Sequence, residues 1–238
     1  MTGPKFLQLQ MDDRPKIIGI RDGTSQAWTT KEFWLVHQEL KAFIKDAHDY
    51  MAGNKPNFDA KWIGITLDKD AYLTDFIDVA GVLRGYFVSD RLKTILESCH
   101  LPEHCFYKVV LHQPEKRGKT LKHIDGYWWF YYQMETGQTN VNFSQSAFQA
   151  SRHPVLDQFG STSILSFEDY KNIYTNTPPA PKAIKLVFNE NFDKALDFWG
   201  TQFLSIRNYI SENLHRKLEE SKITGYKVKA PECELIFD

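Results

Sequence analysis

Hydrophobic residues follow two spacings along this chain, and together they predict a protein of mixed strands and helices. Alternation of apolar and polar positions, or a short apolar run between turn residues, predicts a strand. Such segments span residues 5–11, 16–20, 61–67, 105–111, 127–132, 164–167, 183–188, 226–228 and 233–237. Apolar residues at helical spacing predict a helix over residues 29–53, with a Thr29–Glu32 capping box at its start and Gly53 at its end. Shorter helical patterns occupy residues 71–79 and 192–203.

Residues 127–132 are consecutive aromatic residues, and aromatic side chains favour the pleated surface of a strand. Successive side chains of a strand point to opposite faces, so Trp128, Phe130 and Tyr132 share one face and their neighbours share the other. Because both faces are aromatic, we expect a central strand that is covered on both sides.

One stretch of the sequence occurs twice, at a constant offset of 122 residues (Ser89 and Ser211). Residues 87–97, FVSDRLKTILE, recur as residues 209–219, YISENLHRKLE. Each copy starts with β-favouring residues and continues with a serine that can cap a helix. An acid then follows, which suits the positive end of the helix dipole. Strand patterns flank both helices, so the sequence predicts one strand-helix-strand unit that is used twice.

These patterns together predict an α+β fold with a mixed or mostly antiparallel sheet and a few helices. The duplicated unit is expected over residues 85–111 and 208–237. We place a soft boundary near residue 80, between an N-terminal α+β segment, 1–80, and an α+β domain, 81–238. No linker rich in proline or serine lies between them, so the two parts are expected to pack closely.

The duplicated unit resembles part of a known family. Val88-Ser89 with Leu92 is similar to the opening helix motif of bacterial polymorphic-toxin immunity proteins, in their eleventh catalogued family, formerly a domain of unknown function. The family's later motifs match, in order, the tyrosine-rich strand 127–132, Ser144 and Ser146, Leu196-Asp197-Phe198, and a second helix motif with Ser211, Leu214 and Gly225. The likeness covers residues 81–230, and residues 1–80 have no counterpart. Pro102-Glu103-His104 replaces the glycine that the family has in the first turn.

The resemblance implies a non-catalytic cytoplasmic protein that binds a cognate protein toxin and neutralises it by occlusion. It implies no cofactor, no metal and no catalytic residue. Tyr127, Trp129 and Tyr131 are the candidate partner-binding residues, because aromatic side chains are enriched at binding hot spots. The polar segment 135–162 is a candidate recognition loop, unless it is merely an insertion between strands.

Composition narrows the possible classes of protein. The chain has 238 residues, of which 42% are apolar and 14% aromatic, enough for a substantial core. The net charge of −1 argues against nucleic-acid binding, which requires a basic face. No run approaches the roughly 18 apolar residues of a membrane span, and no apolar signal region follows Met1. Three cysteines are too few for a disulfide scaffold, so we expect a cytoplasmic protein that contacts neither nucleic acid nor membrane.

Two groups of residues offer an alternative hypothesis, a small metal-dependent hydrolase. The run Cys99 to Cys105 contains two cysteines and two histidines, which are preferred zinc ligands, although a histidine at a helix end needs no metal. His112, His123 and Asp125 could support acid–base chemistry. No nucleophile elbow and no phosphate-binding loop occurs in the sequence, so we expect no enzyme. A structural or accessory protein is the third hypothesis.

Overall fold

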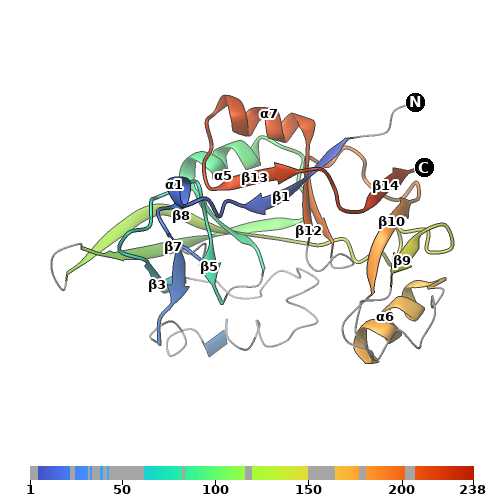
Figure 1. The fold of residues 1–238 in the computed structure, drawn as a ribbon, viewed down its shortest axis with the longest axis horizontal. Coiled ribbons are helices and arrows are strands. Elements are labelled where there is room, and N and C mark those ends of the chain that lie inside the picture. The colour runs from blue at the N-terminus through green and yellow to red at the C-terminus, as the bar shows by residue number, and fades with distance from the viewer. Residues whose placement is uncertain are drawn as a thin grey trace.

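The computed structural model describes residues 5–21, 25–31, 33, 38–39, 42, 62–81, 84–115, 120–149, 164–176, 181–201 and 207–238. Within this part of the chain, three β-sheets combine with the helices α1, α5, α6 and α7 (Figure 1). The predicted α+β class, with mixed and mostly antiparallel sheets, is confirmed.

The largest sheet closes into a barrel. Its strands, in spatial order, are β4 (Phe76–Ile77), β6 (Tyr86–Ser89), β8 (Leu121–Tyr132), β7 (His104–Pro114), β3 (Trp62–Leu67), β2 (Ala27–Thr29) and β5 (Val79–Ala80). Only Asp78 separates β4 from β5, although these strands stand at opposite ends of that order. Residues 76–80 therefore pair with β6 through one half and with β2 through the other, which closes the sheet.

Alternate residues of every strand fill the barrel. This barrel core includes Ala27, Ile65, Ile77, Val79, Phe87, Val109, Leu111 and Trp129. The aromatic strand is covered on both faces, as predicted. Tyr127, Trp129 and Tyr131 lie in the barrel core, and Phe130 and Tyr132 lie in a different core on the other face.

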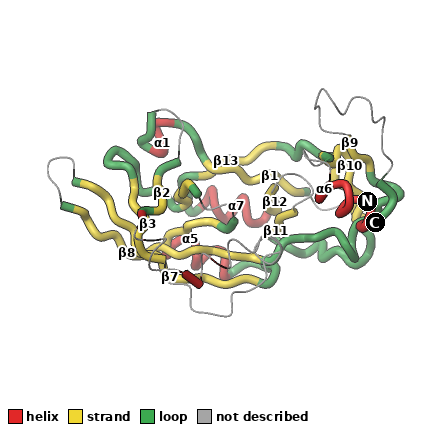
Figure 2. The backbone as a smooth tube through the Cα atoms, turned by 90° about the horizontal axis from the view of Figure 1, so that it is seen from below, coloured by secondary structure: helices red, strands yellow, loops and turns green. Residues whose placement is uncertain are grey.

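Two smaller sheets form the other end of the molecule (Figure 2). A four-stranded sheet orders β11 (Phe198–Thr201), β12 (Arg207–Ser211), β1 (Phe6–Met11) and β13 (Tyr226–Lys229). A three-stranded sheet orders β14 (Glu234–Phe237), β10 (Lys182–Phe188) and β9 (Ala147–Gln149). Together with α6 (Phe167–Asn176), these sheets enclose a separate core that includes Tyr170, Leu186, Trp199 and Tyr209. We call it the second-unit core, because it contains Tyr209 of the second copy of the sequence repeat.

The sequence repeat is also a structural repeat. α5 (Asp90–Glu97) and α7 (Glu212–Glu220) each follow a strand and begin after a serine cap. The cap Oγ accepts a hydrogen bond from the leucine N–H three residues later, at 3.2 Å for Ser89 and 3.0 Å for Ser211. Strand register repeats with the same offset, because Phe76 pairs with Val88 and Phe198 pairs with Ile210. The repeat spans residues 75–107 and 197–229, against the predicted 85–111 and 208–237.

The remaining strand of each unit comes from a different part of the chain. In the first unit, β8 lies between β6 and β7 and follows β7 in sequence. In the second unit, β1 takes the same place between β12 and β13, although it stands near the start of the chain. Met11 pairs with Tyr226 as Tyr132 pairs with His104. Strand pairing therefore crosses the boundary that we placed near residue 80.

The helices α5 and α7 lie side by side where the two units meet (Figure 1), and reciprocal contacts between the units indicate an approximate two-fold axis. Tyr86 and Asn208 are equivalent positions of the two units, and Asn208 Nδ2 donates a hydrogen bond to Tyr86 Oη at 2.6 Å. Equivalent residues can touch only near the axis that relates them. The shared core around this axis is built from equivalent pairs, including Phe76 with Phe198, Val88 with Ile210, Leu92 with Leu214 and Leu96 with Leu218.

Asp75 joins its own helix cap to the opposite unit. Its carboxylate accepts hydrogen bonds from Ser89 Oγ at 2.7 Å and from two nitrogens of Arg91 at 2.7 and 3.2 Å. It also accepts one from the Thr224 backbone N–H of the second unit at 2.9 Å. Burial alone raises the pKa of Asp75, but the hydrogen bonds outweigh burial and leave the pKa below its usual range.

Asp197 repeats this arrangement from the second unit. It accepts hydrogen bonds from Ser211 Oγ at 2.5 Å, from Asn213 Nδ2 at 3.0 Å, and from the His100 backbone N–H of the first unit at 3.1 Å. Burial opposes ionisation here too, yet the hydrogen bonds hold the pKa of Asp197 below its usual range. We call Asp75 and Asp197 the clamp aspartates, because each one organises one helix start and binds the other unit.

Acid should weaken the folded state through the clamp aspartates. Their pKa values are lower in the folded protein than the roughly 3.9 of an unfolded chain, so their stabilisation is present above about pH 4. It is lost as the pH falls through the folded pKa values. We expect the free energy of unfolding, measured with urea, to decrease below about pH 4. The double variant Asp75→Asn with Asp197→Asn should show a smaller decrease, and an equal decrease would assign the effect to other carboxyls.

Several segments differ from their predictions. Residues 16–20 were expected to form a strand, but α1 (Pro15–Ile18) forms because proline suits a first helical turn and Gly19, at φ 82°, ends it. Residues 71–79 and 192–203 show helical spacing but lead into strands. Phe76 and Phe198 face the shared core, whereas Ile77 faces the barrel core and Trp199 faces the second-unit core, which is the alternation of a strand. Residues 164–167 lead into α6, which begins at Phe167, instead of forming a strand. Most of the helix predicted over residues 29–53 lies outside the described residues.

Gly225 shows how closely the two units approach. It has φ 88°, and an added Cβ would lie 2.2 Å from Phe76 O of the first unit. Gly81 has φ 84°, but there a Cβ would meet only Thr29 Oγ1, at 3.6 Å. We expect Gly81→Ala to cost about 1–2 kcal/mol of unfolding free energy, the usual penalty for left-handed backbone. Gly225→Ala should cost more, about 2–3 kcal/mol, because the Phe76 backbone must also move. Equal losses in urea titrations would contradict this close approach.

Candidate binding surface on the barrel

The aromatic residues expected to face a partner are buried. Tyr127, Trp129 and Tyr131 are at most 7% exposed and fill the barrel core. Two of them also bond inside the protein, since Tyr127 Oη donates to Thr74 O at 2.9 Å and Trp129 Nε1 donates to Arg84 O at 3.0 Å. The sequence-based assignment is therefore corrected. Closure of the sheet covers these side chains, so they are not available for contact with another protein.

The Cys99–Cys105 run does not converge on one point. Cys99 packs against the shared core, where burial raises the pKa of its thiol, whereas Cys105 packs against the barrel core. His100 Nε2 bonds Asp193 Oδ2 at 2.7 Å, and His104 is exposed at the start of β7. Across the described residues, no three His, Cys, Asp or Glu side chains gather closely enough to hold a metal ion.

His112, His123 and Asp125 do come together. His112 on β7 pairs directly with His123 on β8, and their ring centroids are 5.4 Å apart. His123 Nε2 bonds Asp125 Oδ1 at 3.1 Å. Their neighbours Leu111 and Ile124 belong to the barrel core, so the histidines lie on the outer face of the barrel. Cys233, the remaining cysteine of the chain, lies in the second-unit core.

The two histidines extend a row of side chains that crosses four strands. Trp28 pairs with Thr66, Thr66 pairs with His112, and His112 pairs with His123. Leu121 stands two residues before His123 on the same face of β8. We call Trp28, Thr66, His112, His123 and Leu121 the outer row. Trp28 is 42% exposed and Leu121 is 55% exposed, so both apolar side chains are accessible to another molecule.

The sequence did not point to Trp28. It lies just before the helix predicted over residues 29–53, but Thr29 belongs to the short strand β2 (Ala27–Thr29), which is recognisable only from its pairing with β3 and β5. Once that strand is known, period-two alternation identifies its exposed side, because Ala27 lies in the barrel core.

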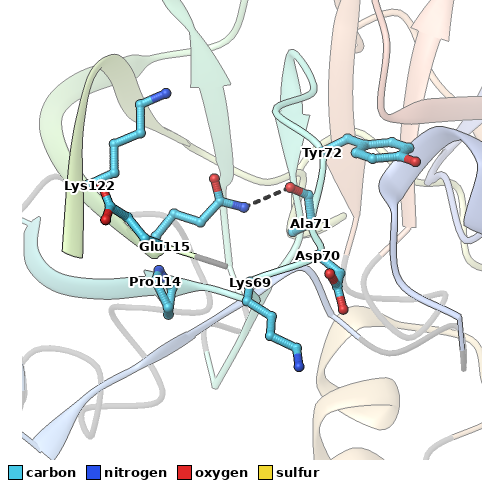
Figure 3. A pocket seen from close by; sticks show the side chains of 8 residues that line it. Lys69, Asp70, Ala71, Tyr72, Pro114, Glu115 and Lys122 are labelled. Carbon is cyan, nitrogen blue, oxygen red and sulfur yellow. Dashed lines mark hydrogen bonds between the residues drawn. The ribbon is translucent and has the colours of Figure 1, made fainter. Parts of the chain in front are cut away.

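A groove of about 230 Å³ opens near the end of the β7–β8 hairpin (Figure 3), and its hairpin residues Gln113 and Lys122 alternate with the outer-row residues along their strands. One wall is residues 69–72 and the other is residues 113–115 with Lys122. Gln113 Nε2 ties the walls together by donating to Asp68 O at 3.0 Å and Ala71 O at 2.8 Å. Two lysines and two acids line the groove, so neither charge dominates. Tyr72 is exposed at the rim, across the groove from Lys122.

The segment 135–162 is described only as far as Gln149. Val141 and Phe143 of this part are buried in the second-unit core, and Asn142 N–H donates to Val187 O of β10 at 2.7 Å. Glu135 is half-buried, and burial raises its pKa despite a hydrogen bond from Asn140. The described part of the predicted recognition loop is therefore partly packed into the protein, through Val141 and Phe143. The rest of that loop lies outside the described residues.

The outer row combines large exposed apolar groups with hydrogen-bonding imidazoles on paired strands. Such a surface can bury tryptophan and leucine against another protein while the histidines donate or accept hydrogen bonds at their edge. No helix of the described part is long and apolar enough to cross a membrane. No protein-family model matches the chain, and no curated protein matches it.

Proposed function

We propose that this chain is a non-catalytic cytoplasmic protein that binds a bacterial protein toxin and neutralises it by occlusion, using the outer row as its contact surface. The observation that carries the proposal is the row itself. Trp28 and Leu121 are exposed apolar side chains on strands of a closed barrel, with His112 and His123 between them.

Two physical properties of the outer row support the proposal: its side chains stand on paired strands, and they include a tryptophan. Side chains on paired strands lose little conformational freedom on binding, so more of the contact free energy remains for affinity. Tryptophan is the residue type most typical of binding hot spots, and a stable complex covers about 800 Å² on each partner. The outer row itself combines apolar side chains, Trp28 and Leu121, with the polar side chains of Thr66, His112 and His123. The resemblance of the duplicated unit to toxin immunity proteins supplies the class of partner.

The proposal is tested with the product of the gene next to the one that encodes this chain. Co-expression should yield a complex that survives size-exclusion chromatography, and the chain should restore growth to cells that produce the neighbouring protein. Absence of both binding and protection would remove the proposal.

Substitutions in the outer row should weaken this complex selectively. We expect Trp28→Ala or Leu121→Asp to raise Kd by about 30-fold or more, as for a hot-spot residue, in isothermal titration calorimetry. Leu165→Asp is the matched control, because Leu165 is also an exposed leucine but precedes α6, away from the barrel. An equal loss of affinity in Leu165→Asp would argue against the outer row as the contact surface.

The alternative function is a small metal-dependent hydrolase, and the observation in its favour is the proximity of His112, His123 and Asp125. Two imidazoles on facing strands can chelate a divalent ion when water completes its coordination. Metal analysis of the purified protein separates the two functions. Stoichiometric zinc that is lost in His123→Ala would favour the hydrolase and count against occlusion.

A further inference from the structure

Three polar side chains in the second-unit core have buried atoms without hydrogen-bond partners. Gln8 pairs with Tyr209 across β1 and β12, and Tyr209 pairs with Trp199 across β12 and β11. Each of the three is at most 1% exposed. Within the described part of the chain, Gln8 Oε1 and Nε2, Trp199 Nε1 and Tyr209 Oη have no partner. Tyr209 and Trp199 are also stacked, with ring centroids 4.4 Å apart.

The first unit shows that the fold does not require polar atoms at these positions. The equivalent row there is Trp129, Phe87 and Ile77. Phe87 and Ile77 carry no polar side-chain atom, and Trp129 Nε1 donates to Arg84 O at 3.0 Å. Because burying an unpaired polar atom destabilises a protein, the polar row of the second unit indicates a missing partner.

A cavity of about 130 Å³ reaches this row at Tyr209. Its other polar lining comes from Arg207, Glu232, Lys182 and Gln149. Arg207 donates to Glu232 Oε2 at 3.0 Å and Lys229 pairs with Glu232 Oε1, so the one carboxylate is fully balanced and, with Lys182, the surroundings of the cavity carry excess positive charge. Burial raises the pKa of Tyr209, which keeps its hydroxyl protonated and able to donate a hydrogen bond.

We propose that this cavity binds a small organic monocarboxylate. The carboxylate would accept a hydrogen bond from Tyr209 Oη and balance the charge of Lys182, while Glu232 would disfavour more highly charged anions such as phosphate. The volume exceeds what one water requires, so a group of several heavy atoms fits. This proposal does not depend on the proposed toxin binding, because the outer row lies on the barrel and this cavity lies in the second unit.

The test is an NMR titration of the full-length protein with sodium acetate, followed by the indole N–H resonance of Trp199. Trp199→Phe assigns that resonance, and sodium chloride at the same ionic strength is the parallel titration. We expect a saturable shift with acetate and none with chloride. Tyr209→Phe should weaken acetate binding by about 10-fold or more, the usual value of a hydrogen bond to a charged group. Tyr127→Phe removes a buried hydroxyl from the barrel and should leave acetate binding unchanged.

Two results would overturn the proposal. One is the absence of a saturable shift with acetate, or an equal shift with chloride. The other concerns the premise that the Tyr209 hydroxyl lacks a partner. Tyr209→Phe without acetate should unfold at the wild-type Tm or above it, whereas Tyr127→Phe breaks a bond to Thr74 O and should unfold at a lower Tm. A lower Tm for Tyr209→Phe would show that its hydroxyl is bonded within the protein.

Discussion

A chain shortened to begin at Asp12 should fail to fold cooperatively, because it lacks the central strand of the second unit. β1 pairs with β12 on one side and with β13 on the other, so its removal separates both neighbours. It also removes the buried side chains of Phe6 and Leu9, which contribute to the second-unit core and the shared core. Each such side chain stabilises by about 1.5–3 kcal/mol, and the lost strand pairing adds to this.

The expected loss approaches the whole stability of a typical domain, about 5–15 kcal/mol. Urea unfolding followed by near-ultraviolet circular dichroism measures it. A chain that begins at Lys5 is the control, because it keeps β1 and should unfold like the full-length protein. A cooperative transition in the shorter chain, with the midpoint of the control, would show that the second unit does not need β1.

Replacement of a clamp aspartate by alanine has the second-largest expected effect, about 3–5 kcal/mol of unfolding free energy for Asp197→Ala, because three donors lose their acceptor at about 1–3 kcal/mol each. The substitution leaves Ser211 Oγ, Asn213 Nδ2 and the His100 N–H without their shared acceptor. Asp75→Ala should be similar, because it also leaves the Arg91 guanidinium without its carboxylate.

Two controls separate the possible causes of that loss. Ser211→Ala removes the helix cap but keeps the contact between the units, and it should cost only about 1 kcal/mol. Asp13→Ala removes an exposed carboxylate that pairs with Lys227, and its unfolding midpoint should stay close to wild type. If Ser211→Ala cost as much as Asp197→Ala, capping alone would explain the role of the aspartate.

The candidate surface was only partly predictable from sequence. His112, His123 and Asp125 were identified as chemically interesting residues, and they are neighbours because β7 and β8 form one hairpin. Trp28 was not identified, since it joins them only through β3, which lies between β2 and β7 in space. Tyr127, Trp129 and Tyr131 were assigned to an interface, but an aromatic pattern does not tell an exposed sheet face from the inside of a barrel.

The features that the sequence predicted correctly are those that depend on local interactions along the chain. The two serine-capped helices, the strands before them and the two-sided aromatic strand depend on residues a few positions apart, so their patterns are complete in the sequence. Contacts between distant residues decided the rest. Closure of the barrel through residues 76–80, the place of β1 in the second unit and the reach of each clamp aspartate across the axis all join segments far apart in sequence. Such pairings depend on packing in three dimensions, and no short-range pattern records them.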